Sequence, residues 1–359
     1  MRSGAVSRTL PDCMSSSFAR LTVVFLVAAA LCSTLASVAP ARLVTATDSV
    51  QPGGGTLPDG SEPTAQQLRK VLPALAPSPP PASQGQIAAR TAGPRLRATL
   101  PPIPVPAIEA QEIVLYNLDT GRFLWQSNAR AAWAPASLTK IFTAMVAVDL
   151  MGLDPTVTVP ASINELPADS TFMGLSPGER LTVRELLYGV FLNSGNDAAE
   201  TLATAVTSRA AFIAAMNAKA GRLGLRTTHF VNPTGLDAAG HYSSAADLAI
   251  ATAYLEAHYP ALVSIAATPS MAIAATATHK AYTLVNLNKL LSTYPGTYGL
   301  KTGWTEAALG CLITTSRRGG HRLLAVMLGA PNRTAYAQMP KVLDYGFELL
   351  GVLPAPARP

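Results

Sequence analysis

The chain reads Pro135-Ala136-Ser137-Leu138-Thr139-Lys140 at the start of an apolar segment that continues to Met151 and stops at Gly152. This segment predicts a helix over residues 138–151. Ser137 and Lys140 are three residues apart, so we expect their side chains on one face of that helix. A serine hydroxyl is a poor nucleophile until a base takes its proton, and a neutral lysine amine one turn away can do so. The stretch therefore indicates a serine nucleophile beside a lysine base.

Two further short motifs follow in chain order. Ser194-Gly195-Asn196 lies in a turn that divides residues 181–205 into two predicted helical pieces, and Lys301-Thr302-Gly303 lies on a predicted strand. A glycine in a strand lets another backbone approach closely, so Gly303 is a candidate contact for a substrate. Each motif alone occurs often by chance. The three together, in this order, match the signature shared by β-lactamases and penicillin-binding proteins.

Residues 108–351 resemble the low-molecular-mass penicillin-binding proteins that act as D-alanyl-D-alanine carboxypeptidases. The resemblance implies a sheet of about five strands flanked by helices, with the active site between the sheet and a helical subdomain. Beyond the three motifs, it is carried by Asp119-Thr120-Gly121, Pro135 to Thr143, Gly178-Glu179, Leu181-Thr182, Ser194 to Ala198, Met216-Asn217, Asn232-Pro233-Thr234-Gly235-Leu236, Asp247-Leu248-Ala249, Asn286 and Gly299 to Thr305.

The resemblance also implies a role for each motif residue. Ser137 would attack the carbonyl of the penultimate D-alanine and form an acyl-enzyme, with Lys140 as general base. Lys140 must be neutral to act, so we expect its pKa to be lowered by Lys301, by the helix N-terminus and by burial. Ser194 would relay a proton to the leaving amine. Asn196 would hold Lys140 and the substrate amide.

A second group of residues would recognise the substrate. Lys301 and Thr302 would receive the terminal carboxylate, or its counterpart in a β-lactam. The backbone N–H groups of Ser137 and Trp304 would form the oxyanion hole. The Trp304 side chain could line the substrate groove or serve packing. Arg333 stands where the family often places an arginine that steers the carboxylate, although Pro331 and the spacing shift the local frame.

The remaining patterns predict the fold class. We expect strands at 113–117, 123–126, 298–302, 309–315 and 322–328, and helices at 210–224, 243–258 and 334–350. Strands at both ends of this region and helices in its middle predict an α+β fold. The expected architecture is an antiparallel sheet flanked by helices with a helical subdomain. By resemblance, this is the β-lactamase/transpeptidase-like fold.

The N-terminal part of the chain predicts export. Arg2, Arg8 and Arg20 precede an apolar run over residues 21–36, followed by small residues. We interpret residues 1–39 as a signal sequence or an N-terminal membrane anchor, and both remain open because Pro40 makes a poor cleavage site. Residues 40–107 are rich in Pro and Ala and predict a disordered tether. We expect the peptidase domain over 108–351 and a disordered tail over 352–359.

Composition excludes several classes of function. The formal net charge is +6, but the basic residues are scattered, so we expect no nucleic-acid partner. Of three cysteines, Cys13 and Cys32 fall in the export segment, which excludes a disulfide framework and an all-cysteine metal site. We expect Cys311 to be a buried small hydrophobe. The five histidines, at 229, 241, 258, 279 and 321, show no metal-binding spacing, and we expect them on the surface or in loops. No metal or other cofactor is implied.

Four functions stay in view. The leading interpretation is an exported D,D-carboxypeptidase that acts on peptidoglycan stem peptides and reacts covalently with β-lactam antibiotics. A D,D-endopeptidase is a close relative that the motifs leave open. A β-lactamase is disfavoured because no glutamate lies in a clearly matching loop. A silent wall-binding module is disfavoured because it needs no pair of nucleophile and base. We interpret Asp197 as a helix cap and Glu179 as a turn residue.

Overall fold

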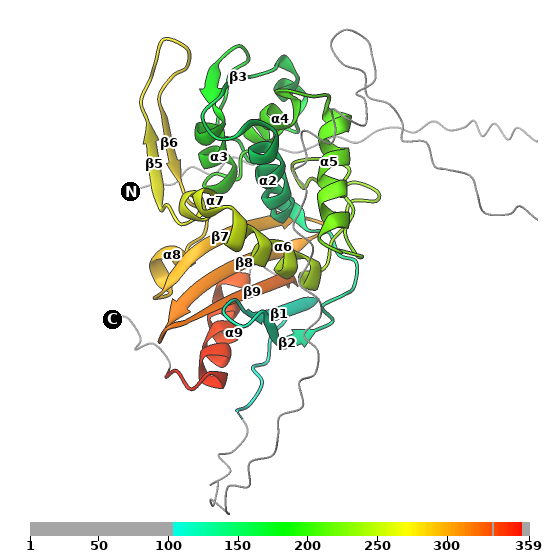
Figure 1. Cartoon of the computed structure of the whole chain (residues 1–359), viewed down its shortest axis with the longest axis vertical. Helices are drawn as coiled ribbons and strands as arrows, with labels where there is room; N and C mark the ends of the chain where they lie inside the picture. Colours follow the sequence, from blue (N-terminus) through cyan, green and yellow to red (C-terminus); the bar gives the residue numbers. More distant parts are fainter. Residues whose placement is uncertain (1–102, 332–333, 354–359) are drawn as a thin grey trace, which may run out of the picture. The chain divides into compact units, whose positions relative to one another are not determined.

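The computed structural model describes residues 103–331 and 334–353. Its largest element is a five-stranded antiparallel sheet with the strand order β2-β1-β9-β8-β7 (Figure 1). The strands are β1 (Glu112–Asn117), β2 (Arg122–Ser127), β7 (Thr297–Thr305), β8 (Leu309–Arg318) and β9 (His321–Ala330). β1 pairs with β9, so the first hairpin of the domain joins its last strand. β7 stands at one end of the strand order.

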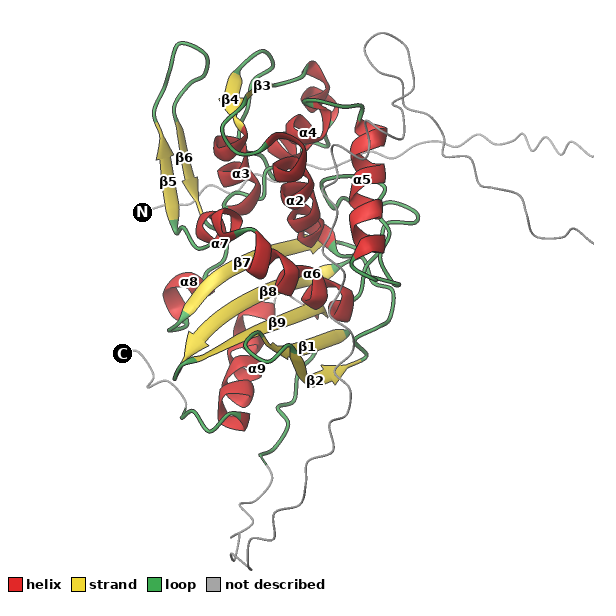
Figure 2. Cartoon of the chain, viewed as in Figure 1, coloured by secondary structure: helices red, strands yellow, loops and turns green. Residues whose placement is uncertain are grey.

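Both faces of the sheet are buried at its central strand β9. Leu323, Ala325 and Met327 of β9 pack in a cluster with α9 (Ala335–Leu349). The alternate residues Leu324, Val326 and Leu328 belong to a second cluster, which includes α6 (Ala245–His258). Successive strand residues point to opposite faces, which explains why β9 is continuously apolar from Leu323 to Leu328. Figure 2 shows α9 and α6 on the two sides of the sheet.

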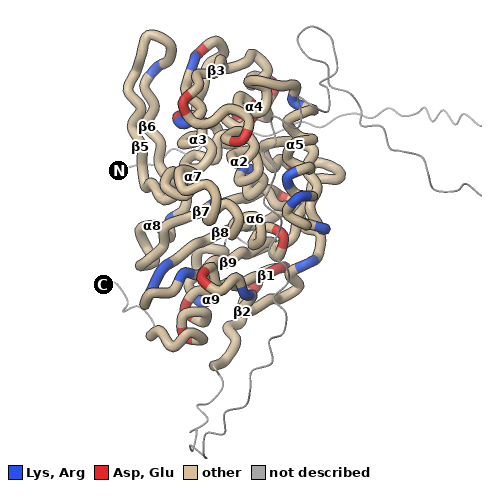
Figure 3. The backbone as a smooth tube through the Cα atoms, in the orientation of Figure 1, with Lys and Arg blue, Asp and Glu red and all other residues tan. Residues whose placement is uncertain are grey.

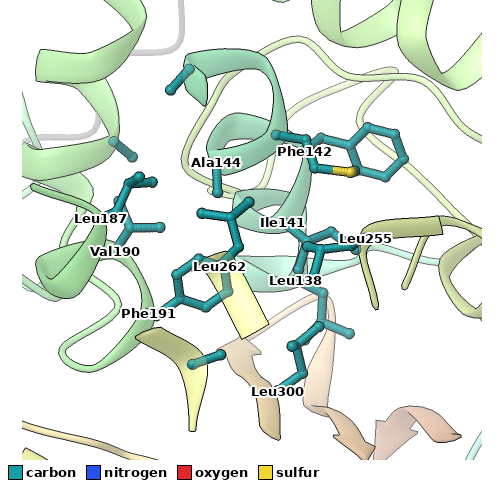
Figure 4. Packing of buried hydrophobic residues seen from close by; sticks show 14 of the residues in the cluster. Leu138, Ile141, Phe142, Ala144, Leu187, Val190, Phe191, Leu255, Leu262 and Leu300 are labelled. Atoms are coloured by element: carbon teal, nitrogen blue, oxygen red, sulfur yellow. The ribbon is translucent and has the colours of Figure 1, made fainter. Parts of the chain in front are cut away.

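A helical part packs beside the face of the sheet that α6 covers. It contains α2 (Lys140–Met151), α3 (Val183–Phe191), α4 (Asn196–Thr204), α5 (Arg209–Arg222) and α7 (Pro260–Ala266). The first eight residues of α2 are all buried, so this helix is enclosed on every side. Figure 4 shows the cluster around it, whose labelled members include Leu138, Ile141, Phe142, Leu255, Leu262 and Leu300. The cluster joins the helical part to α6 and to β7.

Smaller elements complete the described chain. Two pairs of short strands are β3 (Thr156–Thr158) with β4 (Arg180–Thr182), and β5 (Ser270–Ile273) with β6 (Tyr282–Val285). There are also two short 3-10 helices, η1 (Ala136–Thr139) and η2 (Ala161–Glu165), and the one-turn helix α8 (Leu290–Thr293). Among these, η1 adjoins the predicted helix 138–151, and β4 contains residues 181–182, which were predicted to begin a helical piece. The short strands escaped prediction because three or four residues are too few to establish a period of two.

The predicted α+β architecture is confirmed. The five strands expected in the sheet and the helices expected around 138–151, 210–224, 243–258 and 334–350 are all present, with ends shifted by a few residues. The predicted break at 193–196 separates α3 from α4. One detail differs at the segment that carries Ser137. The first helix begins as the 3-10 helix η1, and α2 starts only at Lys140.

Several expectations fall outside the described residues. These are the signal or anchor at 1–39, most of the tether at 40–107, Arg333, and the tail beyond residue 353. Within the described parts, no helix combines the length and apolar character that crossing a membrane requires. Figure 3 shows acidic and basic residues spread over both the sheet and the helices of the described chain.

Candidate active site

Ser137 and Lys140 meet where η1 passes into α2. Lys140 Nζ lies 2.9 Å from Ser137 Oγ. A 3-10 turn places residues i and i+3 directly above one another, so the tight start of the helix brings the two side chains together. Ala136, just before the serine, has a left-handed backbone with φ of 46°. Such a conformation is uncommon for a residue with a Cβ and is frequent at functional sites.

The Lys140 side chain is fully buried, and three oxygen atoms surround its amine. Besides Ser137 Oγ, Nζ contacts Asn196 Oδ1 at 2.7 Å and the carbonyl oxygen of Thr234 at 2.7 Å. Both of these oxygens can only accept. A neutral amine has two N–H bonds for them, and its lone pair then faces the Ser137 hydroxyl. The geometry therefore suits a neutral lysine that takes the proton of Ser137.

Electrostatics favour the same state. Burial lowers the pKa of Lys140 well below its usual value, and the positive charge of Lys301 lowers it further. The carboxylates of Asp197 and Glu200 act in the opposite direction on the pKa and are outweighed. Burial and Lys301 therefore both lower the pKa of Lys140, as expected.

The second buried lysine, Lys301 on β7, faces Ser194. Lys301 Nζ donates to Ser194 Oγ at 2.9 Å and to the carbonyl oxygen of Thr302 at 2.9 Å. Burial lowers the pKa of Lys301 to about 7. Ser194 has a left-handed backbone, with φ of 57°. The turn 194–196 therefore presents Ser194 to one lysine and Asn196 to the other, so all three motifs meet in one place.

The carboxylate of Asp197 joins this turn to a neighbouring loop through hydrogen bonds. It accepts the backbone N–H groups of Met173, Gly174 and Leu175 at 2.8–2.9 Å, as well as that of Ala198. The carbonyl oxygen of Thr171 accepts the N–H of Asn196 at 2.8 Å. The interpretation of Asp197 as a helix cap is wrong, because Gly195 is the N-cap of α4 and the Asp197 carboxylate instead fastens a separate loop against the Ser194–Asn196 turn.

A segment to which the motifs assigned no role lies directly against the nucleophile. Asn232 Oδ1 accepts the N–H groups of Thr234 and Gly235, at 3.2 and 2.7 Å, and this fixes the carbonyl that contacts Lys140. Thr143 of α2 donates to the carbonyl oxygen of Pro233 at 2.6 Å. The signal for this contact was the Asn-Pro-Thr-Gly turn sequence, which predicts a tight turn but not its neighbour.

Two glycines allow the close packing around Ser137. A Cβ built on Gly235 would lie 1.9 Å from the carbonyl oxygen of Ala136, and Gly235 has φ of +87°. A Cβ on Gly303 would lie 3.1 Å from the backbone nitrogen of Ser137. Gly303 was expected to make room for a substrate. The structure adds a second reason, since the protein's own backbone already approaches this residue closely.

Two of the histidines lie in loops, as expected, yet their side chains are buried: His241 is 6% exposed and His279 is 7% exposed. His241 Nδ1 accepts the backbone N–H of Val231 at 3.1 Å, so its proton is on Nε2, which faces Thr139 Oγ1 at 2.8 Å. Burial lowers the pKa of His241 to about 4. Local backbone and hydroxyl partners let this neutral ring enter the interior, which composition could not reveal.

The remaining candidates divide into described and undescribed residues. Thr302 is partly buried beside Lys301, and Trp304 is 48% exposed at the end of β7.

Cys311 is buried as expected, and burial raises the pKa of its thiol to about 12. Glu179 is a structural turn residue, because it accepts the N–H groups of Ser176 and Lys280. Arg333 lies outside the described residues. Among the residues that are described, no group of three His, Cys, Asp or Glu side chains could hold a metal ion.

Known proteins resemble this chain in sequence and in fold. DacF, a D-alanyl-D-alanine carboxypeptidase of Bacillus subtilis, is 39% identical over 246 residues, which are 67% of this chain and 63% of DacF. DacB2 of Mycobacterium tuberculosis is 36% identical over 255 residues, 69% of this chain and 85% of DacB2. The solved structure of a Streptomyces DD-transpeptidase is 31% identical, with a TM-score of 0.65, over 68% of this chain and all of that chain.

The match to the family as a whole covers most of the described chain. The sequence profile described as D-alanyl-D-alanine carboxypeptidase, Peptidase S11, matches residues 99–332. The chain spans slightly less than two thirds of the length of DacF. The profile, the relatives and the solved structures agree with the motifs and the geometry. This chain therefore belongs to the D-alanyl-D-alanine carboxypeptidase family of serine peptidases.

Proposed function

We propose that the protein is a serine D,D-carboxypeptidase that removes the terminal D-alanine from peptidoglycan stem peptides and that β-lactams inhibit it covalently. The observation that carries this proposal is the convergence of two buried lysines on two serines. Lys140 contacts Ser137, and Lys301 contacts Ser194. A module that only binds cell wall has no need of two lysines whose pKa values are lowered beside hydroxyl groups.

Acylation begins when Lys140 takes the proton of Ser137, whose oxygen attacks the carbonyl carbon of the penultimate D-alanine. The negative charge on the carbonyl oxygen would be met by the backbone N–H groups of Ser137 and Trp304. When the C–N bond breaks, the Ser194 hydroxyl protonates the leaving amine and takes a proton from Lys301, 2.9 Å away. The products are free D-alanine, an ester on Ser137, a charged Lys140 and a neutral Lys301.

Deacylation runs the same proton path in reverse. Lys301, through Ser194, takes a proton from the attacking water, and Lys140 returns a proton to Ser137 as the ester breaks. Both lysines end in their starting states. The lowered pKa of Lys301, about 7, suits a group that must give and accept a proton near neutral pH.

Recognition of a free C-terminal carboxylate would come from Lys301, Thr302 and Arg333. Lys301 supplies charge, Thr302 a hydroxyl, and an arginine fork can hold both carboxylate oxygens. Asn196 would receive the substrate amide. By this proposal, residues 1–39 direct export, residues 40–107 tether the domain, and the enzyme works in the cell envelope.

Product analysis with a pentapeptide ending in D-Ala-D-Ala tests the proposal. Mass spectrometry should show the tetrapeptide and free D-alanine, and labelled penicillin should acylate the protein but not Ser137→Ala. Equal labelling of both proteins would refute the nucleophile assignment. The similarity to a DD-transpeptidase suggests one added arm, in which an amine acceptor is supplied. A product that joins the acceptor to the peptide, with little tetrapeptide, would replace the carboxypeptidase by a transpeptidase.

A further inference from the structure

One loop contacts residues that come before and after the nucleophile in the sequence. Residues 232–241, here called the bridging loop, run between α5 and α6. Gly235 packs against the backbone of Ala136 and Ser137, and Thr234 contacts Lys140. At the end of the loop, His241 faces Thr139. The loop is therefore fastened to η1 and to the start of α2, the segment that carries the nucleophile.

The same loop reaches the turn that follows β7. Asp237 Oδ1 accepts the hydroxyl of Thr305 at 2.7 Å, and Asp237 Oδ2 accepts the backbone N–H of Ala307 at 3.2 Å. Thr305 Oγ1 in turn accepts the N–H of Ala308 at 3.0 Å. One carboxylate thus organises the turn between β7 and β8, directly after Trp304.

The outer part of this turn has little packing of its own. Glu306 and Ala307 are exposed and Thr305 is only partly buried, whereas Ala308 is buried in the core and its carbonyl oxygen accepts the Trp133 Nε1–H at 2.9 Å. Exposed turns with few apolar contacts open easily, so their position depends on their hydrogen bonds. The carboxylate bonds of Asp237 tie the turn to a loop that is itself fastened to Ser137.

We propose that Asp237 is a positioning residue for the oxyanion hole. It holds the β7–β8 turn, and with it the backbone N–H of Trp304, at a fixed place relative to the N–H of Ser137. The inference rests on the proposed function, which assigns the oxyanion hole to these two N–H groups. Preorganised donors stabilise a developing oxyanion only within a few tenths of an ångström of the right position, so a loosened turn would lower the rate.

The experiment compares Asp237→Ala, Asp237→Asn and Thr305→Val with the wild type. The matched control is Glu306→Gln, which removes a negative charge from the same turn. We expect Asp237→Ala to lower kcat for D-Ala-D-Ala peptide by roughly tenfold to a hundredfold, with KM changed less than about twofold. Asp237→Asn retains an acceptor for Thr305 and should lose less. The double variant of Asp237→Ala with Thr305→Val should be no worse than Asp237→Ala alone, while Glu306→Gln should match the wild type.

A peptide boronic acid separates positioning from mere destabilisation. Its tetrahedral adduct with Ser137 places an oxygen in the oxyanion hole, so its Ki should rise in Asp237→Ala by about the factor by which kcat/KM falls. A partly unfolded preparation lowers kcat but leaves Ki unchanged, and penicillin titration counts its intact sites.

The outcomes are distinct. Unchanged kcat and Ki in Asp237→Ala would overturn the positioning role, and so would a lowered kcat with unchanged Ki. A wild type that neither releases D-alanine nor takes penicillin at Ser137 would instead refute the proposed function, and the oxyanion hole with it.

Discussion

Lys140 and Lys301 are both buried beside a serine, yet their settings differ. Lys140 lies at the first turn of α2 with three oxygen partners from three segments of the chain. Lys301 lies on β7 with two partners, one of which is the carbonyl of its own neighbour Thr302. The positive charge of Lys301 helps to lower the pKa of Lys140, whereas burial is the cause of the lowered pKa of Lys301.

The difference suggests a division of labour. Lys140 has every N–H bond committed to an acceptor, which suits a base that must stay in one place and stay neutral. Lys301 has fewer protein partners, which suits a group that also meets the carboxylate of a substrate. Identical side chains can therefore differ in function because the backbone supplies different acceptors. Four experiments test this difference between the two lysines.

The largest effect should come from Lys140→Met, which keeps an unbranched apolar chain but removes the base. We expect acylation by penicillin to slow by roughly two to four orders of magnitude, because general base catalysis contributes on that scale. Stopped-flow measurement of the acylation rate checks this, with circular dichroism as the control for folding. Acylation within tenfold of the wild-type rate would assign the role of base to another group.

Arg333→Ala asks whether Lys301 binds the carboxylate alone. A charge-assisted contact is worth about 1.5–3 kcal/mol, so loss of the arginine should lower kcat/KM for peptides by roughly one to two orders of magnitude. The melting temperature should stay close to that of the wild type, because the proposal assigns this arginine to the substrate and not to the fold.

The control for this variant is a peptide with an amidated C-terminus, which should be a poor substrate for both proteins. If Arg333→Ala turns over the free peptide as fast as the wild type does, then Lys301 and Thr302 suffice for carboxylate binding.

A smaller effect is expected on the pH profile. The active form of Lys140 is neutral, so the acylation rate should rise with pH through the lowered pKa of this group. In Lys301→Met the nearby positive charge is absent, so the pKa of Lys140 should rise and the acid limb should move to higher pH. An ester substrate without a carboxylate isolates this effect from binding. An acid limb at the same pH in both proteins would show that Lys301 does not tune the base.

The smallest effect should follow from removing residues 1–106. Gln111 donates its N–H to Leu328, and Ile108 packs against the cluster beneath α9, so the sheet has its contacts from about Ile108 onward. A chain that begins at Ala107 should unfold cooperatively and keep wild-type kcat/KM. Loss of cooperative unfolding would mean that the contrast between the two lysines depends on the segment before residue 107.

Short motifs predicted the chemistry of this site better than its scaffold. Each of its five residues lies at a local signal, which is a helix start, a turn or a strand, and the tertiary structure brings them together: Ser137, Lys140, Ser194, Asn196 and Lys301. A turn residue or a helix start is encoded within a few neighbours, so it can be read from sequence. The same holds for the continuous apolar run of β9, whose residues fill two clusters.

The bridging loop and the buried histidine could not be predicted in this way. Thr234 acts through its carbonyl oxygen, and every residue type has one, so no sequence pattern distinguishes it. His241 lies 102 positions from its partner Thr139, and the pairing depends on the packing of the whole domain. Asp237 reaches Thr305 over 68 positions. Contacts of this kind are settled by tertiary structure, which single-sequence patterns do not contain.

The burial of Lys301 also couples ligand binding to the uptake of protons. In an unfolded chain this lysine has its usual pKa of 10.5, whereas in the fold it titrates at about 7. Between these values the unfolded chain holds the proton and the folded one does not, so stability should rise with pH across that window. A carboxylate that pairs with Lys301 restores the charged form. Above neutral pH, each peptide or β-lactam that binds should therefore draw protons from the buffer, and calorimetry in buffers of different ionisation enthalpy would measure that uptake.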